Sequence, residues 1–125
     1  MNINIDVESS SLAMAALASP VRLQILLWLL DPRAHFPRQR DGDLVDDGVC
    51  VGFITDKVGL SQPTVSSHMK KMSEAGLVTG KRIGNWMFYK PDRTRLEDLG
   101  LKLTCASQTD PEASNAGQRA TETVS

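Results

Sequence analysis

Residues 60–72 read Leu60-Ser61-Gln62-Pro63-Thr64-Val65-Ser66-Ser67-His68-Met69-Lys70-Lys71-Met72, and the pattern of these residues predicts a capped helix with one apolar stripe. Ser61 is a favoured helix N-cap, and Pro63 is tolerated in a first turn because its missing N–H would be unpaired there. Gly76 is suited to end the helix in the left-handed conformation. The apolar residues at the i, i+4 and i+7 positions, which should point inward, are Val65, Met69 and Met72.

The opposite face of this helix carries short polar and basic side chains. They belong to Thr64, Ser66, Ser67, Lys70 and Lys71, with Gln62 at the exposed N-terminal tip. Small side chains let a helix backbone approach the floor of a DNA groove, where Gln, Ser and Thr can hydrogen-bond base edges and Lys can hold phosphates. His68 lies at the margin of the apolar stripe, so packing, a hydrogen bond at the helix edge and a DNA contact all remain open for it.

The residues before this stretch indicate two longer helices and one short helix. Ser19-Pro20 is a favoured helix start, which predicts helices over 8–17 and 20–30. Gly59 should end a short helix over 52–58. The side chains of these three helices that we expect to face the core are Leu12, Ala13, Ala16, Leu17, Val21, Ile25, Leu26, Trp28, Leu29, Phe53, Ile54 and Val58.

Residues 32–48 read as a long polar connection that leads into a short strand over 49–51. The connection holds two prolines, two glycines and a group of acids. Connections of this length within a compact domain are usually functional or mobile. The acids are Asp41, Asp43, Asp46 and Asp47.

A β-hairpin is predicted after the helix that Ser61 caps, with strands over 77–82 and 86–90. Ile83-Gly84-Asn85 supplies the turn chemistry between them. Lys81 and Arg82 flank the tip of this hairpin, so its end should be basic.

The length of 125 residues predicts one folded domain. We expect residues 1–7 to be loose and residues 8–105 to form the domain, which ends in a helix over 93–104. Residues 106–125 are mostly Ser, Thr, Ala, Gln and Glu and should form a disordered tail.

Charge and composition narrow the classes of function. Between Thr55 and Arg95 there are eight basic and three acidic residues, although the whole chain has a net charge of −1. This local excess suits a polyanion, and a solvated face is the alternative. No apolar run reaches the roughly 18 residues of a membrane helix. The N-terminus lacks the features of a secretory signal, so we expect a cytoplasmic protein without a membrane partner.

Helix, glycine-containing turn, second helix and basic hairpin is the element order of a winged helix-turn-helix. In this order the sequence resembles the ArsR (arsenic-repressor type) family of transcription regulators. The segments that carry the resemblance are Leu17 to Leu26, Val58 to Met69, Ala75-Gly76-Leu77-Val78 and Trp86-Met87-Phe88-Tyr89.

The resemblance implies a mainly α-helical fold with a small β-hairpin wing, which dimerises through its first and last helices. It also implies a homodimeric repressor on a palindromic operator in double-stranded DNA, relieved by a small ligand, a metal ion or oxidation. The bases would be read by Gln62, Thr64, Ser66 and Ser67, and phosphates would be met by Lys70 and Lys71. The other residues that we expect at the DNA are Ser61, Pro63, His68, Lys81, Arg82 and Asn85.

Two positions depart from the pattern of the family. Ser67 stands where Arg or His is frequent, so its contact should be weaker or mediated by water. Asn85 stands at the wing tip where Arg is common, so wing contact with phosphates should rest on Lys81 and Arg82.

The metal sites of the family are not matched. Where relatives have a Cys-x-Cys motif, this chain has Cys50-Val51-Gly52, and its last helix lacks His. No metal ion can therefore be assigned and the inducer is unknown. Four alternatives stay open: a redox pair of Cys50 with Cys105, a metal site in the long connection, a small organic ligand, or no inducer. Two inert thiols are the alternative to the redox pair. The possible ligands in that connection are His35, Asp41, Asp43, Asp46, Asp47 and Cys50.

An enzyme is not expected. The sequence has no glycine-rich phosphate loop and no nucleophile elbow, and only His35 and His68 could act as bases at neutral pH. The alternative to a DNA-binding regulator is a winged-helix module for protein–protein contact, which would not need the basic excess.

Overall fold

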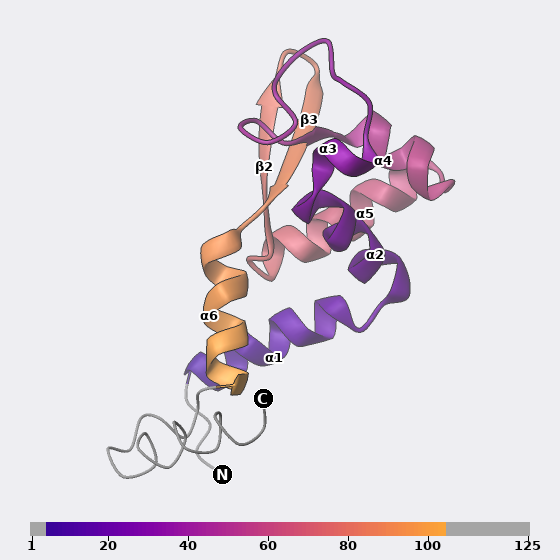
Figure 1. Ribbon diagram of the computed structural model, residues 1–125. Coiled ribbons are helices and arrows are strands. Elements are labelled where there is room, and N and C mark those ends of the chain that lie inside the picture. Colours follow the sequence, from indigo (N-terminus) through magenta and orange to yellow (C-terminus); the bar gives the residue numbers. More distant parts are fainter. Residues whose placement is uncertain (1–4, 105–125) are drawn as a thin grey trace, which may run out of the picture. The chain divides into compact units, whose positions relative to one another are not determined.

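The computed structural model describes residues 5–104, which form two compact units that divide after Arg93. The helices and strands of the first unit are α1 (Ile5–Leu17), α2 (Pro20–Leu30), α3 (Pro32–His35), β1 (Val49–Cys50), α4 (Val51–Val58), α5 (Gln62–Glu74), β2 (Val78–Ile83) and β3 (Trp86–Pro91). α6 (Arg93–Thr104) begins at the division (Figure 1). This is the predicted mainly α-helical fold with a hairpin wing.

The helix predicted to begin at the Ser61 cap is α5, and its apolar stripe is confirmed. Its stripe residues Val65, Met69 and Met72 are each 0% exposed. Ser61 is the N-cap, with its Oγ accepting a hydrogen bond from the Thr64 N–H at 3.4 Å. The stripe packs α5 against α1, α2 and α4, so the core fixes which side of the helix faces solvent.

The turn before α5 depends on a glycine. Gly59 has φ +75° and donates its N–H to the Thr55 carbonyl at 3.0 Å, which closes α4 as predicted. α4 begins at Val51 rather than at residue 52, and Val51 is buried with Ile54. The prediction that Phe53 and Val58 face the core was only partly right, because both are half-buried. A two-turn helix packed along one narrow face buries few side chains fully.

β1, β3 and β2 form, in that order, an antiparallel three-stranded sheet. Ile83 pairs with Trp86, so the turn of the hairpin consists only of Gly84 and Asn85. Gly84 has φ +60°, as the first central residue of a tight hairpin turn requires. The predicted hairpin is confirmed, with its first strand shifted by one residue.

α2 begins as predicted, with Ser19 as N-cap and Pro20 in the first turn. Its buried residues are Ile25, Leu26 and Leu29. Val21 and Trp28 were expected in the core, but both are half-buried. α1, α2 and α5 contact one another in the first unit (Figure 1).

Trp28 lies at the edge of the core, where its ring contacts an aromatic ring and a lysine ammonium group. Its ring meets Phe36 edge-on at a centroid separation of 6.4 Å, and the Lys57 ammonium lies 5.1 Å from the ring centroid. A cation over the ring face is attracted by the aromatic quadrupole. Full burial of the Trp28 ring would take the charged ammonium group of Lys57 out of water, so the ring stays partly exposed.

α1 begins at Ile5, three residues before the expected start, and packs through small residues. Ala13 and Ala16 are buried, as predicted. Leu12, predicted to be in the core, is instead 65% exposed, and Leu17 is half-buried. Short alanines let α1 approach α2 and α5 closely, and this leaves the larger apolar side chains outside.

Residues 32–48 are more structured than a polar connection. They begin with the one-turn helix α3 and bury Phe36 and Leu44. The Gln39 side chain accepts a hydrogen bond from the Cys50 N–H at 2.7 Å and donates to the Gly48 carbonyl at 3.0 Å. The Gln39 amide thus occupies the free side of β1, as a further strand would.

α6 has no buried residue in the described structure, and a Lys102–Asp98 ion pair of 3.0 Å lies on it. The predictions for residues 1–4, for Cys105 and for the tail over 106–125 lie outside the described residues.

Within residues 5–104, no single helix has the length and apolar character needed to cross a membrane. α1 and α2 would have them only as a joined pair, and the two are bent by 97° at Ala18–Ser19.

Candidate nucleic-acid interface

The exposed face of α5 has the predicted composition. Gln62, Pro63, Thr64, Ser67, Lys70 and Lys71 are exposed, whereas Ser66 and His68 are half-buried. No acidic residue lies in the first turn, so the positive end of the helix dipole is not neutralised there. This face therefore combines short hydrogen-bonding side chains with positive charge.

Ser61 and Thr64 have a structural part in this face. Their hydroxyl oxygens lie 2.8 Å apart, and Ser61 also caps the helix through the Thr64 N–H. These hydroxyls hold the first turn of α5 in place. Gln62, next to the cap, is exposed at the tip of the helix.

His68 forms a hydrogen bond at the helix edge, one of the alternatives open for it. Its Nδ1 lies 3.0 Å from Nη1 of Arg22, whose Nε donates to the Ala16 carbonyl at 2.7 Å. A guanidinium can only donate, so Nδ1 accepts and the imidazole proton of neutral His68 is on Nε2. Burial, and then the charges of Arg22 and Lys71, lower the pKa of His68 below 6.5. The ring therefore links α1, α2 and α5 in its neutral form.

The bases of the wing differ in their surroundings. Lys81 Nζ forms an ion pair with Asp47 Oδ1 at 2.6 Å, and Lys90 Nζ donates to the Asp46 carbonyl at 3.0 Å. Arg82 is exposed, and so is Asn85 in the turn. The acidic connection thus reaches the wing, which the sequence did not indicate.

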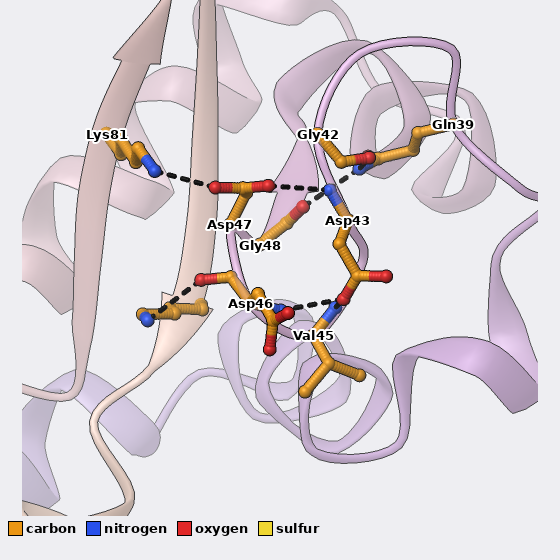
Figure 2. Close-up of polar contacts among 9 residues, drawn as sticks. Gln39, Gly42, Asp43, Val45, Asp46, Asp47, Gly48 and Lys81 are labelled. Atoms are coloured by element: carbon orange, nitrogen blue, oxygen red, sulfur yellow. Dashed lines mark hydrogen bonds and ion pairs between the residues drawn. The ribbon is translucent and has the colours of Figure 1, made fainter.

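Two carboxylates of the connection, those of Asp43 and Asp47, accept backbone N–H groups of the connection itself (Figure 2). Asp43 Oδ2 accepts the N–H groups of Val45 and Asp46, each at 2.8 Å, and these bonds are the main reason that the pKa of Asp43 is lowered. The hydrogen bond from Lys81 and then that from the Asp43 N–H lower the pKa of Asp47. Both carboxylates therefore stay ionised and occupied.

The metal site considered for this connection is not assembled. Within the described part of the chain, no three His, Cys, Asp or Glu side chains come close enough to hold a metal ion. Asp43 and Asp47 turn toward backbone N–H groups and Lys81, and His35 is exposed on α3. Proximity in the sequence does not make these side-chain oxygens converge on one point.

Cys50 is a free, half-buried thiol. It lines an open cavity of about 340 Å³ together with Phe53, Trp86 and Phe88. The sequence suggested Cys50 from its position before α4, but nothing in it indicated the aromatic residues around the thiol.

Known proteins resemble this chain in sequence. Residues 46–79 match the family model described as "Bacterial regulatory protein, arsR family". An uncharacterised HTH-type transcriptional regulator, YbzH of Bacillus subtilis, is 40% identical over 84 residues, which cover 67% of this chain and 84% of YbzH. The HTH-type transcriptional repressor SmtB of Mycobacterium tuberculosis is 34% identical over 77 residues, covering 62% of this chain and 46% of SmtB.

Solved structures share the fold. A homodimeric winged helix-turn-helix DNA-binding domain of Mb0332 from Mycobacterium bovis, a possible ArsR-family transcriptional regulator, has a TM-score of 0.57 at 22% identity, covering 82% of both chains. HlyU from Vibrio cholerae has a TM-score of 0.56 at 23% identity, covering 82% of this chain and 99% of HlyU.

Proposed function

Since this chain belongs to the ArsR family of bacterial regulatory proteins, we propose that it is a cytoplasmic, homodimeric repressor of a palindromic operator. The family makes it a DNA-binding transcriptional regulator and not an enzyme. Repression, symmetry of the operator and release by an inducer belong to the proposal.

The exposed face of α5 supports the proposed DNA binding most directly. Its side chains are small or basic, and the buried stripe on the other side holds the helix firmly. We propose that Gln62, Thr64, Ser66 and Ser67 meet base edges while Lys70 and Lys71 meet phosphates, because short polar groups read bases and cations position the backbone. Ser61, Pro63 and the Nε2–H of His68 would lie beside the DNA backbone. The wing would add Arg82 and Asn85.

Exposed apolar side chains support a dimer. Val7, Leu12 and Met14 on α1 are 53%, 65% and 47% exposed, and Leu101 and Leu103 on α6 are 59% and 61% exposed. Large apolar side chains that gather on exposed helices are typical of interaction surfaces. We propose that the first and last helices meet a second copy of the chain. Two α5 helices would then meet two half-sites about one turn of DNA apart.

Cys50 is our candidate for a redox route of release. We propose that its thiol pairs with that of Cys105 on mild oxidation, with the electrons passing to an added disulfide or peroxide. Mass spectrometry of the oxidised protein should then show one intramolecular cross-link between Cys50 and Cys105. Two free thiols after this treatment would exclude the pair.

Binding to DNA from beside its own gene tests the proposed function. We expect a gel shift at low salt that weakens steeply as the salt concentration rises, because phosphate contacts release counterions. The Lys70→Gln, Lys71→Gln double variant should shift the DNA more weakly, because it lacks two of the proposed phosphate contacts. A winged-helix module for protein contact would give no shift even at low salt.

A further inference from the structure

Lys81 and Arg82 are neighbours in β2 but project from opposite faces of the wing. Successive side chains of a strand alternate between the two faces. Lys81 pairs across the hairpin with Phe88, and Arg82 pairs with Met87. Phe88 also pairs with Cys50 of β1, so Lys81 lies on the face that carries the Cys50 side chain. The two bases therefore cannot serve the same surface.

Asp47 is a preorganised partner for Lys81, as Figure 2 shows. One carboxylate oxygen, Oδ1, lies 2.6 Å from Lys81 Nζ, and the other, Oδ2, accepts the Asp43 N–H at 2.7 Å. The side chain of Asp47 is only 24% exposed. Because the carboxylate is already fixed by the loop, it loses little conformational freedom when it binds the ammonium group.

The loop around Asp47 fits tightly against the hairpin. Gly48 has φ +104°, and a Cβ there would lie 2.5 Å from the carbonyl oxygen of Tyr89. A Cβ on Gly42 would lie 3.2 Å from Cδ1 of Ile83, which belongs to the other strand of the hairpin. Only glycine allows both the backbone conformation and the close approach at residue 48. The loop thus contacts both strands of the wing.

The outer part of the wing lacks a third strand. β1 pairs only with Phe88 and Tyr89, and Lys81 is the partner of Phe88 on β2, so the hairpin from Arg82 to Met87 extends beyond the third strand. Two-stranded hairpins are only marginally stable without further packing. The Asp47–Lys81 ion pair lies where the third strand ends, and it ties the outer hairpin to the body of the domain.

We propose that Asp47 and Lys81 form a brace for the wing, and that Arg82 is the base through which the wing meets phosphate. This proposal rests on the proposed DNA binding. A phosphate at the Lys81 ammonium group would approach the fixed Asp47 carboxylate, and the two like charges would repel. Arg82 has no ion-pair partner among residues 5–104. Lys81 is accordingly a positioning residue.

Three single variants of the full chain test the brace: Asp47→Asn, Lys81→Gln and Arg82→Gln. The asparagine keeps an oxygen that can accept the Asp43 N–H but loses the charge. Hydrogen exchange of the backbone amides of residues 81–88 is measured without DNA. The affinity for a DNA duplex is measured over a series of salt concentrations.

Asp47→Asn and Lys81→Gln should each speed exchange of the outer hairpin about two- to fivefold, as expected for a partly exposed ion pair. The double variant should exchange no faster, because the two residues act as one pair. Lys81→Gln should leave the salt slope of binding unchanged. Arg82→Gln should leave exchange unchanged and reduce the slope by about 0.9 for each phosphate that Arg82 neutralises in the wild type.

The opposite pattern would overturn the brace. If Lys81→Gln lowers the salt slope as far as Arg82→Gln does and leaves exchange unchanged, Lys81 binds phosphate itself. Unchanged exchange in both Asp47→Asn and Lys81→Gln would equally exclude the brace. A wild-type chain that binds no DNA would contradict the proposed function, while the exchange data would still decide whether the ion pair holds the wing.

Discussion

His68 shows how a single residue at the exposed edge of α5 can stabilise the fold. Its Nδ1 accepts from Arg22, and Arg22 in turn donates to the end of α1. The hydrogen bond requires an unprotonated Nδ1. Protonation of the ring would break it and place two cations side by side.

The stability of the protein should therefore depend on pH through His68. The pKa of His68 is lowered below 6.5 in the folded state, so the unfolded chain binds the proton first as the pH falls. The contribution of His68 is complete above about pH 6.5 and is lost as the pH falls through the folded pKa. Urea unfolding at pH 7.5 and pH 5 should show a larger loss for wild type than for His68→Gln. An identical loss in both proteins would contradict this account.

Pairs such as Arg22 and His68 explain why residue-scale detail was hard to predict. The two residues are 46 positions apart, and no periodic pattern connects them. The same holds for Lys81 and Asp47, which are 34 positions apart. The sequence indicated that Lys81 was basic and near the wing tip, but only the folded chain shows which carboxylate it meets.

At the scale of elements, α5 depends on its cap as well as on its stripe. Ser61 satisfies the Thr64 N–H, which would otherwise lack a partner within the helix. Ser61→Ala should lower the free energy of unfolding by about 1 kcal/mol. Ser67→Ala is the matched control, because this exposed serine lies within the helix, and it should change stability by less than about 0.5 kcal/mol. Equal losses in chemical denaturation would show that Ser61 does not act as a cap.

Elements with strong local signals were predictable. α5 and α2 follow from a serine cap, a proline in the first turn and an apolar stripe, and the hairpin follows from Gly84-Asn85 between apolar strands. The connection before β1 was not, because side-chain hydrogen bonds of Gln39 to residues nine and eleven positions away shape it. Hydrogen bonds of this kind leave no repeating trace in a sequence.

For the whole molecule, we expect assembly through the exposed apolar face of α1. Leu12→Glu should convert the dimer into monomers in sedimentation experiments, because a charge would be buried at the interface without a partner. DNA affinity should fall with it, since the two half-sites would be bound independently. Val45→Glu is the control, because Val45 is 43% exposed in the connection before β1. A dimer that survives Leu12→Glu would place the interface elsewhere.

If α5 reads the DNA sequence, loss of the exposed Gln62 side chain in Gln62→Ala should change the base preference of the protein. Affinities are measured for a selected operator and for a panel of its single base-pair substitutions, with Lys70→Ala as the comparison. Gln62→Ala should abolish the preference at one base pair, worth about 1–3 kcal/mol, and keep the preferences at the others. Lys70→Ala should weaken all sites alike and lower the salt slope by about 0.9 for each phosphate that Lys70 neutralises. A Gln62→Ala protein that keeps every preference, or a wild type that does not discriminate among sequences, would show that α5 does not read bases through Gln62.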